Sequence, residues 1–178
     1  PSNSFIYLYG DMNMEEKLDW IDREYLSRFD RIQVDSAIPL QKPFGQTAQI
    51  RMSYPVLDQE PLEHNTYLAS SRVVGDSLDT TLNVAFSVLE YALLDAPGAP
   101  VKQALLDARI GKDVEGSYED GILQPYFSIV AKQADPEDKD RFEQVIRESL
   151  EKLVREGVDR KALASGINYF EFRFREAD

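Results

Sequence analysis

The sequence contains no cysteine and only one histidine, His64. Without cysteine the chain cannot form a disulfide, a thiolate zinc site or a cysteine nucleophile. One histidine also excludes a zinc site built on two histidines of this chain. Any Ser-His-Asp triad would have to use His64, which lies in the polar turn formed with Glu63 and Asn65. The sequence therefore excludes thiol chemistry and a two-histidine zinc site within this chain, whereas chemistry by carboxylates alone stays open.

Long apolar runs, glycine-rich phosphate loops and an excess of basic charge are also lacking. No run approaches the roughly 18 apolar residues of a membrane span, so we expect no membrane partner. Lys and Arg number 20 against 32 Asp and Glu, which gives a net charge of −12. Because nucleic-acid binding needs clustered Lys and Arg, we expect no nucleic-acid partner. The negative charge permits basic peptides as partners, although solubility alone also accounts for it.

The remaining composition is typical of a soluble globular protein, with 43% hydrophobic residues in a chain of 178. That length suffices for a sizeable core, and we expect residues 1–178 to form a single domain. Alternating and short apolar segments predict strands. These expected strands cover residues 4–9, 47–54, 66–74, 113–119 and 122–134.

Helical spacing of apolar residues, together with capping residues and prolines, predicts five helices. Their expected starts are a cap at Asn13, a cap at Asp76 or Ser77, Pro100 in a first turn, Asp135 before Pro136, and a cap at Asp159. Expected ends are the region 28–30, Pro97, Gly111 and Gly157. The order βα-ββαα-ββαα predicts an α+β fold, with helices packed on one face of a mainly antiparallel sheet.

The two ends of the chain are unusual for a natural domain. The sequence starts in an expected strand without an initiator Met and stops inside an expected helix, FEFRFREAD. Domains usually begin and end in exposed, loosely structured segments. We therefore expect a domain excised from a longer polypeptide, with its last helix truncated.

Several long segments resemble the presequence-protease branch of the insulinase-type zinc peptidases. They are PSNSFIYLYGDMNMEEKLDWI, the helix start VVG-x-SLD, VLEYALLDAPGAPVKQALLDARIGKDVEGSYEDGILQPYFSIVAK, and the end GINYFEFRFREAD. Members of this family have four related α+β domains, arranged as two halves that close on a peptide. The resemblance covers nearly the whole chain.

The resemblance also implies which part of such a peptidase this chain matches. The first domain of the family carries the inverted zinc motif H-x-x-E-H, with two ligands and a general base. That motif is absent here, so the match is to the second domain, which carries no metal ligand. We expect no catalytic residue and no metal site in this chain, which alone should be inactive, and zinc only in the parent enzyme.

In this family the second domain lines the closed chamber and helps to hold the substrate. A strand edge can accept a peptide by β-augmentation, and the expected strand around Gly116 is a candidate. Gly116 lacks a side chain and so leaves room for another backbone to approach, or it marks a bulge. Gly98 is a second candidate, or only a turn residue between two prolines. Tyr118 contacts substrate, or pairs across strands with Tyr126. The candidate substrate-binding residues are Gly98, Val114, Glu115, Gly116, Ser117 and Tyr118.

Two functions follow from these observations. The first is a non-catalytic substrate-chamber domain of a zinc-dependent oligopeptidase that degrades short unstructured peptides. Its partners would be the catalytic domain and the C-terminal half of the parent peptidase, together with peptide substrate. The alternative is a catalytically inactive structural protein of the same fold, like a processing subunit. The expected location is the bacterial cytoplasm, with an organelle as the alternative.

Overall fold

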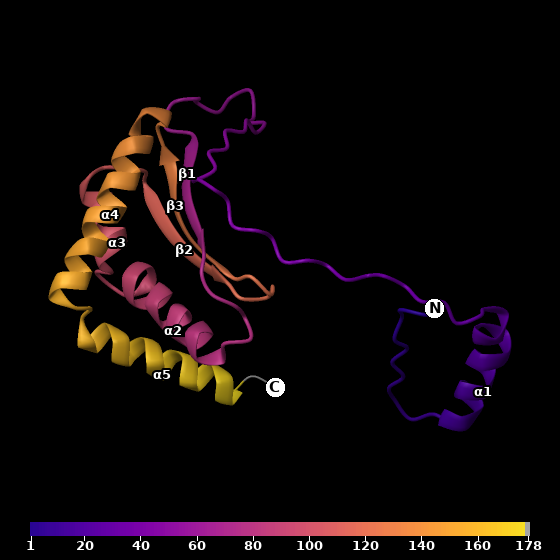
Figure 1. Cartoon of the computed structure of the whole chain (residues 1–178). Helices are drawn as coiled ribbons and strands as arrows, with labels where there is room; N and C mark the ends of the chain where they lie inside the picture. Colours follow the sequence, from indigo (N-terminus) through magenta and orange to yellow (C-terminus); the bar gives the residue numbers. More distant parts are fainter. Residues whose placement is uncertain (177–178) are drawn as a thin grey trace. The chain divides into compact units, whose positions relative to one another are not determined.

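A computed structural model describes residues 1–176 of the chain. It divides into two compact units, Pro1–Leu40 and Gln41–Asp178, which are considered separately below. The larger unit contains the β-sheet and all but one of the α-helices (Figure 1).

The smaller unit is built around one amphipathic helix, α1 (Met14–Glu24). Asn13 caps it as expected, since Asn13 Oδ1 accepts a hydrogen bond from the Glu16 N–H at 3.3 Å. The α-helix is shorter than expected, and a 3-10 turn, η1 (Leu26–Arg28), follows it.

The strand expected at residues 4–9 is not formed, and the prediction of β-structure there is wrong. The Phe5 side chain is fully exposed, at 101% of its reference area. The apolar pattern alone cannot form a strand, because a β-strand needs a neighbouring strand to pair with its backbone groups. No strand lies within the described part of this unit.

The larger unit contains a three-stranded antiparallel sheet (Figure 1). Its strands are β1 (Thr66–Val73), β2 (Asp113–Glu119) and β3 (Tyr126–Ala134), in the spatial order β1-β3-β2. β2 and β3 correspond to the strands expected at residues 113–119 and 122–134, and they pair as an antiparallel hairpin. Together with the helices, this sheet confirms the predicted α+β class.

Residues 47–54 alternate in polarity but do not form the expected strand. Ile50 and Met52 are each 83% exposed, so the apolar face of this segment packs on nothing in the described chain. Tyr54 is the exception: its hydroxyl group hydrogen bonds to the backbone oxygen of Asn65 at 2.5 Å. The expected order therefore loses two of its strands, because alternation predicts a face but not a pairing partner.

In Figure 1 the helices of the larger unit lie on one side of the sheet, and the last of them packs along the first rather than on the strands. They are α2 (Thr80–Glu90), continued by the π-helical turn η2 (Tyr91–Asp95), then α3 (Pro100–Asp107), η3 (Pro136–Asp138), α4 (Lys139–Glu156) and α5 (Arg160–Glu176). Pro100 opens α3, Gly157 ends α4 with φ +86°, and Asp159 Oδ1 accepts from the Ala162 N–H, all as expected.

Four boundaries differ from the prediction, each for a local reason. The α-helix expected from Pro136 begins at Lys139, after η3, and the Asp135 side chain does not cap it because it accepts from the His64 N–H instead. Asp79, not Asp76 or Ser77, caps α2, because Asp76 instead accepts a hydrogen bond from the Leu78 N–H in the preceding turn. The left-handed residue just after α3 is Arg109, with φ +58°, ahead of Gly111. β3 begins after Pro125, because a central strand needs backbone donors on both sides and proline has none.

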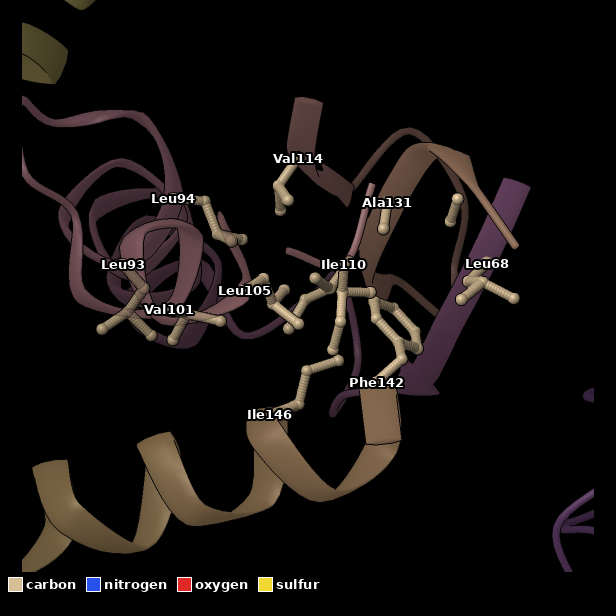
Figure 2. Packing of buried hydrophobic residues seen from close by; sticks show 12 residues of the cluster. Leu68, Leu93, Leu94, Val101, Leu105, Ile110, Val114, Ala131, Phe142 and Ile146 are labelled. Atoms are coloured by element: carbon tan, nitrogen blue, oxygen red, sulfur yellow. The ribbon is translucent and has the colours of Figure 1, made fainter. Parts of the chain in front are cut away.

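The core lies between the sheet and the helices. Figure 2 shows Leu105, Ile110 and Phe142 converging from three different segments, with Val114 and Ala131 above them on the sheet. The side chains of Leu94, Val101, Leu105, Ile110, Val114 and Phe142 are essentially excluded from solvent. The ends of α3 and β2 are thus fixed by burial as well as by backbone pairing.

Candidate functional site

The candidate residues from Val114 to Tyr118 lie on β2, at one edge of the sheet (Figure 1). One side of β2 pairs with β3, and no strand within residues 1–176 pairs with its other side. The register continues without a shift from Asp113↔Lys132 to Glu119↔Tyr126. The alternative of a bulge at Gly116 is therefore wrong.

The outer edge of β2 has few free backbone donors. Antiparallel pairing turns the N–H groups of alternate residues away from the partner strand. The Val114 N–H donates to Asp113 Oδ1 at 2.8 Å, which places the N–H groups of Val114, Gly116 and Tyr118 on the outer edge. The Tyr118 N–H lies close enough to the Glu90 carboxylate to lower the pKa of that group. Among the described residues, Gly116 therefore carries the free N–H of this edge.

Two of the candidate side chains are part of the fold itself. Val114 is fully buried in the core. The Tyr118 hydroxyl donates to Asn83 Oδ1 at 2.5 Å, and the Tyr118 ring stacks on Phe86 with 5.5 Å between ring centroids. Burial raises the pKa of the Tyr118 hydroxyl. Tyr118 faces Phe127 across the sheet, so the expected pairing with Tyr126 is wrong.

Gly116 is small because a helix packs directly against it. A Cβ at this position would lie 2.3 Å from Leu94 Cδ1 and 3.0 Å from Leu94 Cβ. Leu94 belongs to η2 and is fully buried. The missing side chain therefore admits Leu94 to the inner face of β2.

Gly116→Ala is expected to lower the free energy of unfolding by about 1–3 kcal/mol, the usual cost of overpacking a core. Leu94→Ala alone should also destabilise the protein, by about 2–5 kcal/mol. The double variant should cost less than the sum, because the new methyl group occupies space that Leu94 vacates. Urea unfolding of the four proteins measures this coupling, and strict additivity would contradict the close contact.

The other two candidate side chains are on the opposite face of β2. Glu115 Oε1 lies 2.5 Å from Lys132 Nζ, and the hydrogen bond to Glu115 raises the pKa of Lys132. The Ser117 hydroxyl donates weakly to Glu119 Oε1 at 3.4 Å. This face therefore presents small and charged groups rather than an apolar surface.

Gly98 lies apart from β2, in the turn between η2 and α3. Its φ is +73°, in the left-handed region that favours glycine, and nothing lies within 4 Å of where a Cβ would be. The Ala99 N–H closes the turn onto the Ala96 carbonyl at 2.9 Å. These observations support its role as a turn residue.

Acidic side chains gather around the end of α2 and η2 near β2. Burial is the main cause that raises the pKa of Glu90, and the neighbouring charge of Asp95 adds to it. Burial also raises the pKa of Asp95, with Glu115 contributing. By contrast, the hydrogen bond from Lys102 holds the pKa of Asp113 below its usual value. The β2 edge thus has a negative environment suited to a cationic ligand.

Glu90→Gln is expected to stabilise the protein at neutral pH, by roughly a few tenths of a kcal/mol, since the half-exposed charge is screened by solvent. The pKa of Glu90 is higher in the folded state than in the unfolded state. Ionised Glu90 therefore opposes folding at pH 7, and this penalty decreases as the pH falls through the folded-state pKa and is gone below the unfolded-state pKa.

Urea unfolding at pH 7 and at pH 4 measures the difference. The gain from Glu90→Gln should be present at pH 7 and vanish at pH 4. Glu63→Gln, which removes the same charge from an exposed turn, is the control. An equal gain from both variants at pH 7 would show that net charge alone is responsible.

The sequence does not predict the polar contact between His64 and Asp135. Asp135 accepts the His64 N–H at 3.0 Å, and its other oxygen lies 2.7 Å from His64 Nδ1. His64 has a φ of +53°, which its carboxylate partner helps to hold. The two residues are 71 positions apart, so no local pattern connects them.

The residues present do not fit a zinc ion. Among residues 1–176, no group of three or more His, Asp or Glu side chains is placed to hold a metal. The pair formed by His64 and Asp135 supplies two donor side chains, short of the three protein ligands of a catalytic zinc site. Within the same residues, no helix is both long and apolar enough to cross a bilayer.

Comparison with known proteins agrees with this fold. The family described as the Peptidase M16 inactive domain matches residues 1–170. Protein HypA of Clostridium perfringens is 37% identical over 178 residues, which are 100% of this chain and 18% of HypA. Presequence protease 1 of Arabidopsis thaliana is 30% identical over 180 residues, which are 99% of this chain and 17% of that protease.

The fold has solved counterparts. A crystal structure of an inactive peptidase domain from Bordetella parapertussis aligns with a TM-score of 0.55 and 18% identity, over 63% of this chain and 62% of that one. The chain spans less than a fifth of the length of the curated relatives named above. Its resemblance to presequence proteases is confirmed, and the chain belongs to the M16 peptidase family, as an inactive domain of that family.

Proposed function

We propose that this chain is the non-catalytic domain that lines the substrate chamber of a zinc-dependent oligopeptidase. The observation that carries the proposal is the family match as an inactive domain, joined to a donor set that does not fit zinc. The catalytic domain and the C-terminal half of a longer peptidase are its proposed partners. Short unstructured peptides are its proposed substrates, and the bacterial cytoplasm or an organelle is its proposed location.

The proposed contribution of this chain is to hold peptide away from the scissile bond. The outer edge of β2 supports it, because the Gly116 N–H is free there and an extended peptide can accept from it. The acidic groups Glu90 and Asp95 favour a basic peptide. A peptide seated along the whole edge would compete with Asp113 and Glu90 for the N–H groups of Val114 and Tyr118. This competition would keep binding weak.

The test of the overall proposal compares this chain with the longer protein that contains it. The 178-residue chain should bind zinc with no defined stoichiometry and should not cleave an unstructured ten-residue peptide. The longer protein should cleave it and lose activity when a chelator removes zinc. Specific peptidase activity of the pure chain would overturn the proposal. An inactive longer protein would favour the structural alternative.

The β2 edge requires its own test, because the proline side chain in Gly116→Pro would also clash with Leu94. We therefore place both variants in a Leu94→Ala background. Gly116→Pro then removes the N–H, whereas Gly116→Ala keeps it and adds a similar Cβ. Titration with a fluorescent arginine-rich peptide should show about three- to tenfold weaker binding for the proline variant only. This factor corresponds to the free energy of one hydrogen bond. Equal binding would exclude the edge as the peptide site.

A further inference from the structure

An open groove of about 870 Å³ lies on the helix-covered side of the sheet, apart from the β2 edge. Its walls are α4 on one side and α2 with η2 on the other, and its floor is formed by β1 and β3 (Figure 1). Phe86 and Leu89 line it from α2, and Phe127 and Ile129 from β3. The groove is therefore apolar at its centre and lies within the larger unit.

The α4 wall shows that this groove is left uncovered by the described chain. Four apolar residues follow one another every fourth position along one stripe of α4. Their exposure rises steadily, from 1% at Phe142 and 7% at Ile146 to 38% at Leu150 and 87% at Val154. Figure 2 shows the first two pointing into the core. The sequence continues the apolar stripe for two turns beyond the point where the core ends.

The rim of the groove has a charge opposite to that of the chain. Arg72, Arg147 and Arg155 line it, against Glu143 and Glu151. Arg72 lies 3.8 Å from Glu143, while Arg147 and Arg155 form no ion pair with any residue in the range 1–176. The rim thus has one positive charge in excess, in a chain whose net charge is −12. It would complement acidic groups on whatever covers the groove.

We propose that the groove binds an amphipathic helix with an acidic polar face, and that another part of the longer protein supplies this helix. This inference rests on the proposed function, in which the chain is one domain of a larger peptidase. The named curated relatives are more than five times as long as this chain, so they contain ample sequence to supply such a helix. The groove extends the core of this domain rather than forming a substrate site.

A helix suits the groove better than an extended segment. The stretch from Ile146 to Val154 is about 12 Å long, a little over two helical turns. A strand laid there would leave its backbone N–H and C=O groups against apolar side chains, at a high cost. A helix satisfies its own backbone and presents apolar residues on one face to Leu150 and Val154, with acidic residues at its border toward Arg147 and Arg155.

The absence of cysteine in this chain allows a direct test. Val154→Cys places a thiol in the groove, and Lys152→Cys places one on the opposite side of α4. In the 178-residue chain, both thiols should react with N-ethylmaleimide at similar rates. In the longer protein, the Val154→Cys thiol should react at least about tenfold more slowly, and the Lys152→Cys thiol should be unchanged. Peptide mass spectrometry reports labelling at each position.

The identity and charge of the occupant are tested in the same background. A photo-crosslinking p-benzoylphenylalanine at position 150 should join a helix of the same polypeptide. Joint Arg147→Glu and Arg155→Glu changes should abolish most of the protection, and joint changes of the same residues to Lys should retain it. Unprotected Val154→Cys, or cross-linking to a second copy, overturns the proposal. A protected groove in a longer protein without peptidase activity would overturn the proposed function alone.

Discussion

Replacing Phe142 by alanine is expected to lower the free energy of unfolding by about 3–5 kcal/mol, the usual cost of deleting a buried phenylalanine. Phe142 is 1% exposed and begins the apolar stripe of α4. Its ring meets the cluster that contains Ile110 and Ala131 (Figure 2). One substitution would therefore loosen α4 from both the end of α3 and the central strand.

The measurement is urea unfolding followed by far-ultraviolet circular dichroism, with Phe172→Ala as the matched control. Phe172 is a phenylalanine on α5 that is 63% exposed, so its removal should change the free energy of unfolding by less than about 0.5 kcal/mol. If Phe142→Ala cost no more than Phe172→Ala, α4 would not be anchored in the core as described. A variant too unstable to purify would agree with the upper end of the range.

The elements that the sequence predicts well are those whose signals are local. Asn13, Pro100, Gly157 and Asp159 each fix a helix end through their own backbone or side-chain chemistry, and the structure has all four. The β2–β3 hairpin was predictable because its strands are adjacent in sequence.

The wrong predictions concern relations between distant residues. Residues 4–9 and 47–54 have strand-like patterns, but a pattern does not say whether a partner strand exists. The same limit applies to the candidate site. That β2 lies at an edge depends on β1 pairing with the far side of β3. The small size of Gly116 is explained by Leu94, which contacts it from another element.

Gly111 and Gly98 have nearly the same backbone conformation, with φ of +72° and +73°, and yet their alanine variants are expected to differ sharply. A left-handed conformation alone costs a non-glycine residue about 1–2 kcal/mol. At Gly98 that is the whole cost, because nothing lies within 4 Å of the new Cβ. At Gly111 the new Cβ would also lie 2.6 Å from the Lys132 carbonyl oxygen, which is backbone of the central strand.

Gly111→Ala is therefore expected to lower the free energy of unfolding by about 2–5 kcal/mol in total, since a backbone clash adds an overpacking cost to the conformational one. The clash matters because the Lys112 N–H donates to that same Lys132 carbonyl at 2.9 Å, at the start of β2. Relieving the clash between the new Cβ and the Lys132 carbonyl would move β2 away from β3 where the candidate edge begins. Thermal and urea unfolding of both variants isolates the contact. An equal loss at Gly98 and Gly111 would mean that conformation alone explains both glycines, and that the junction of β2 with β3 is looser than described.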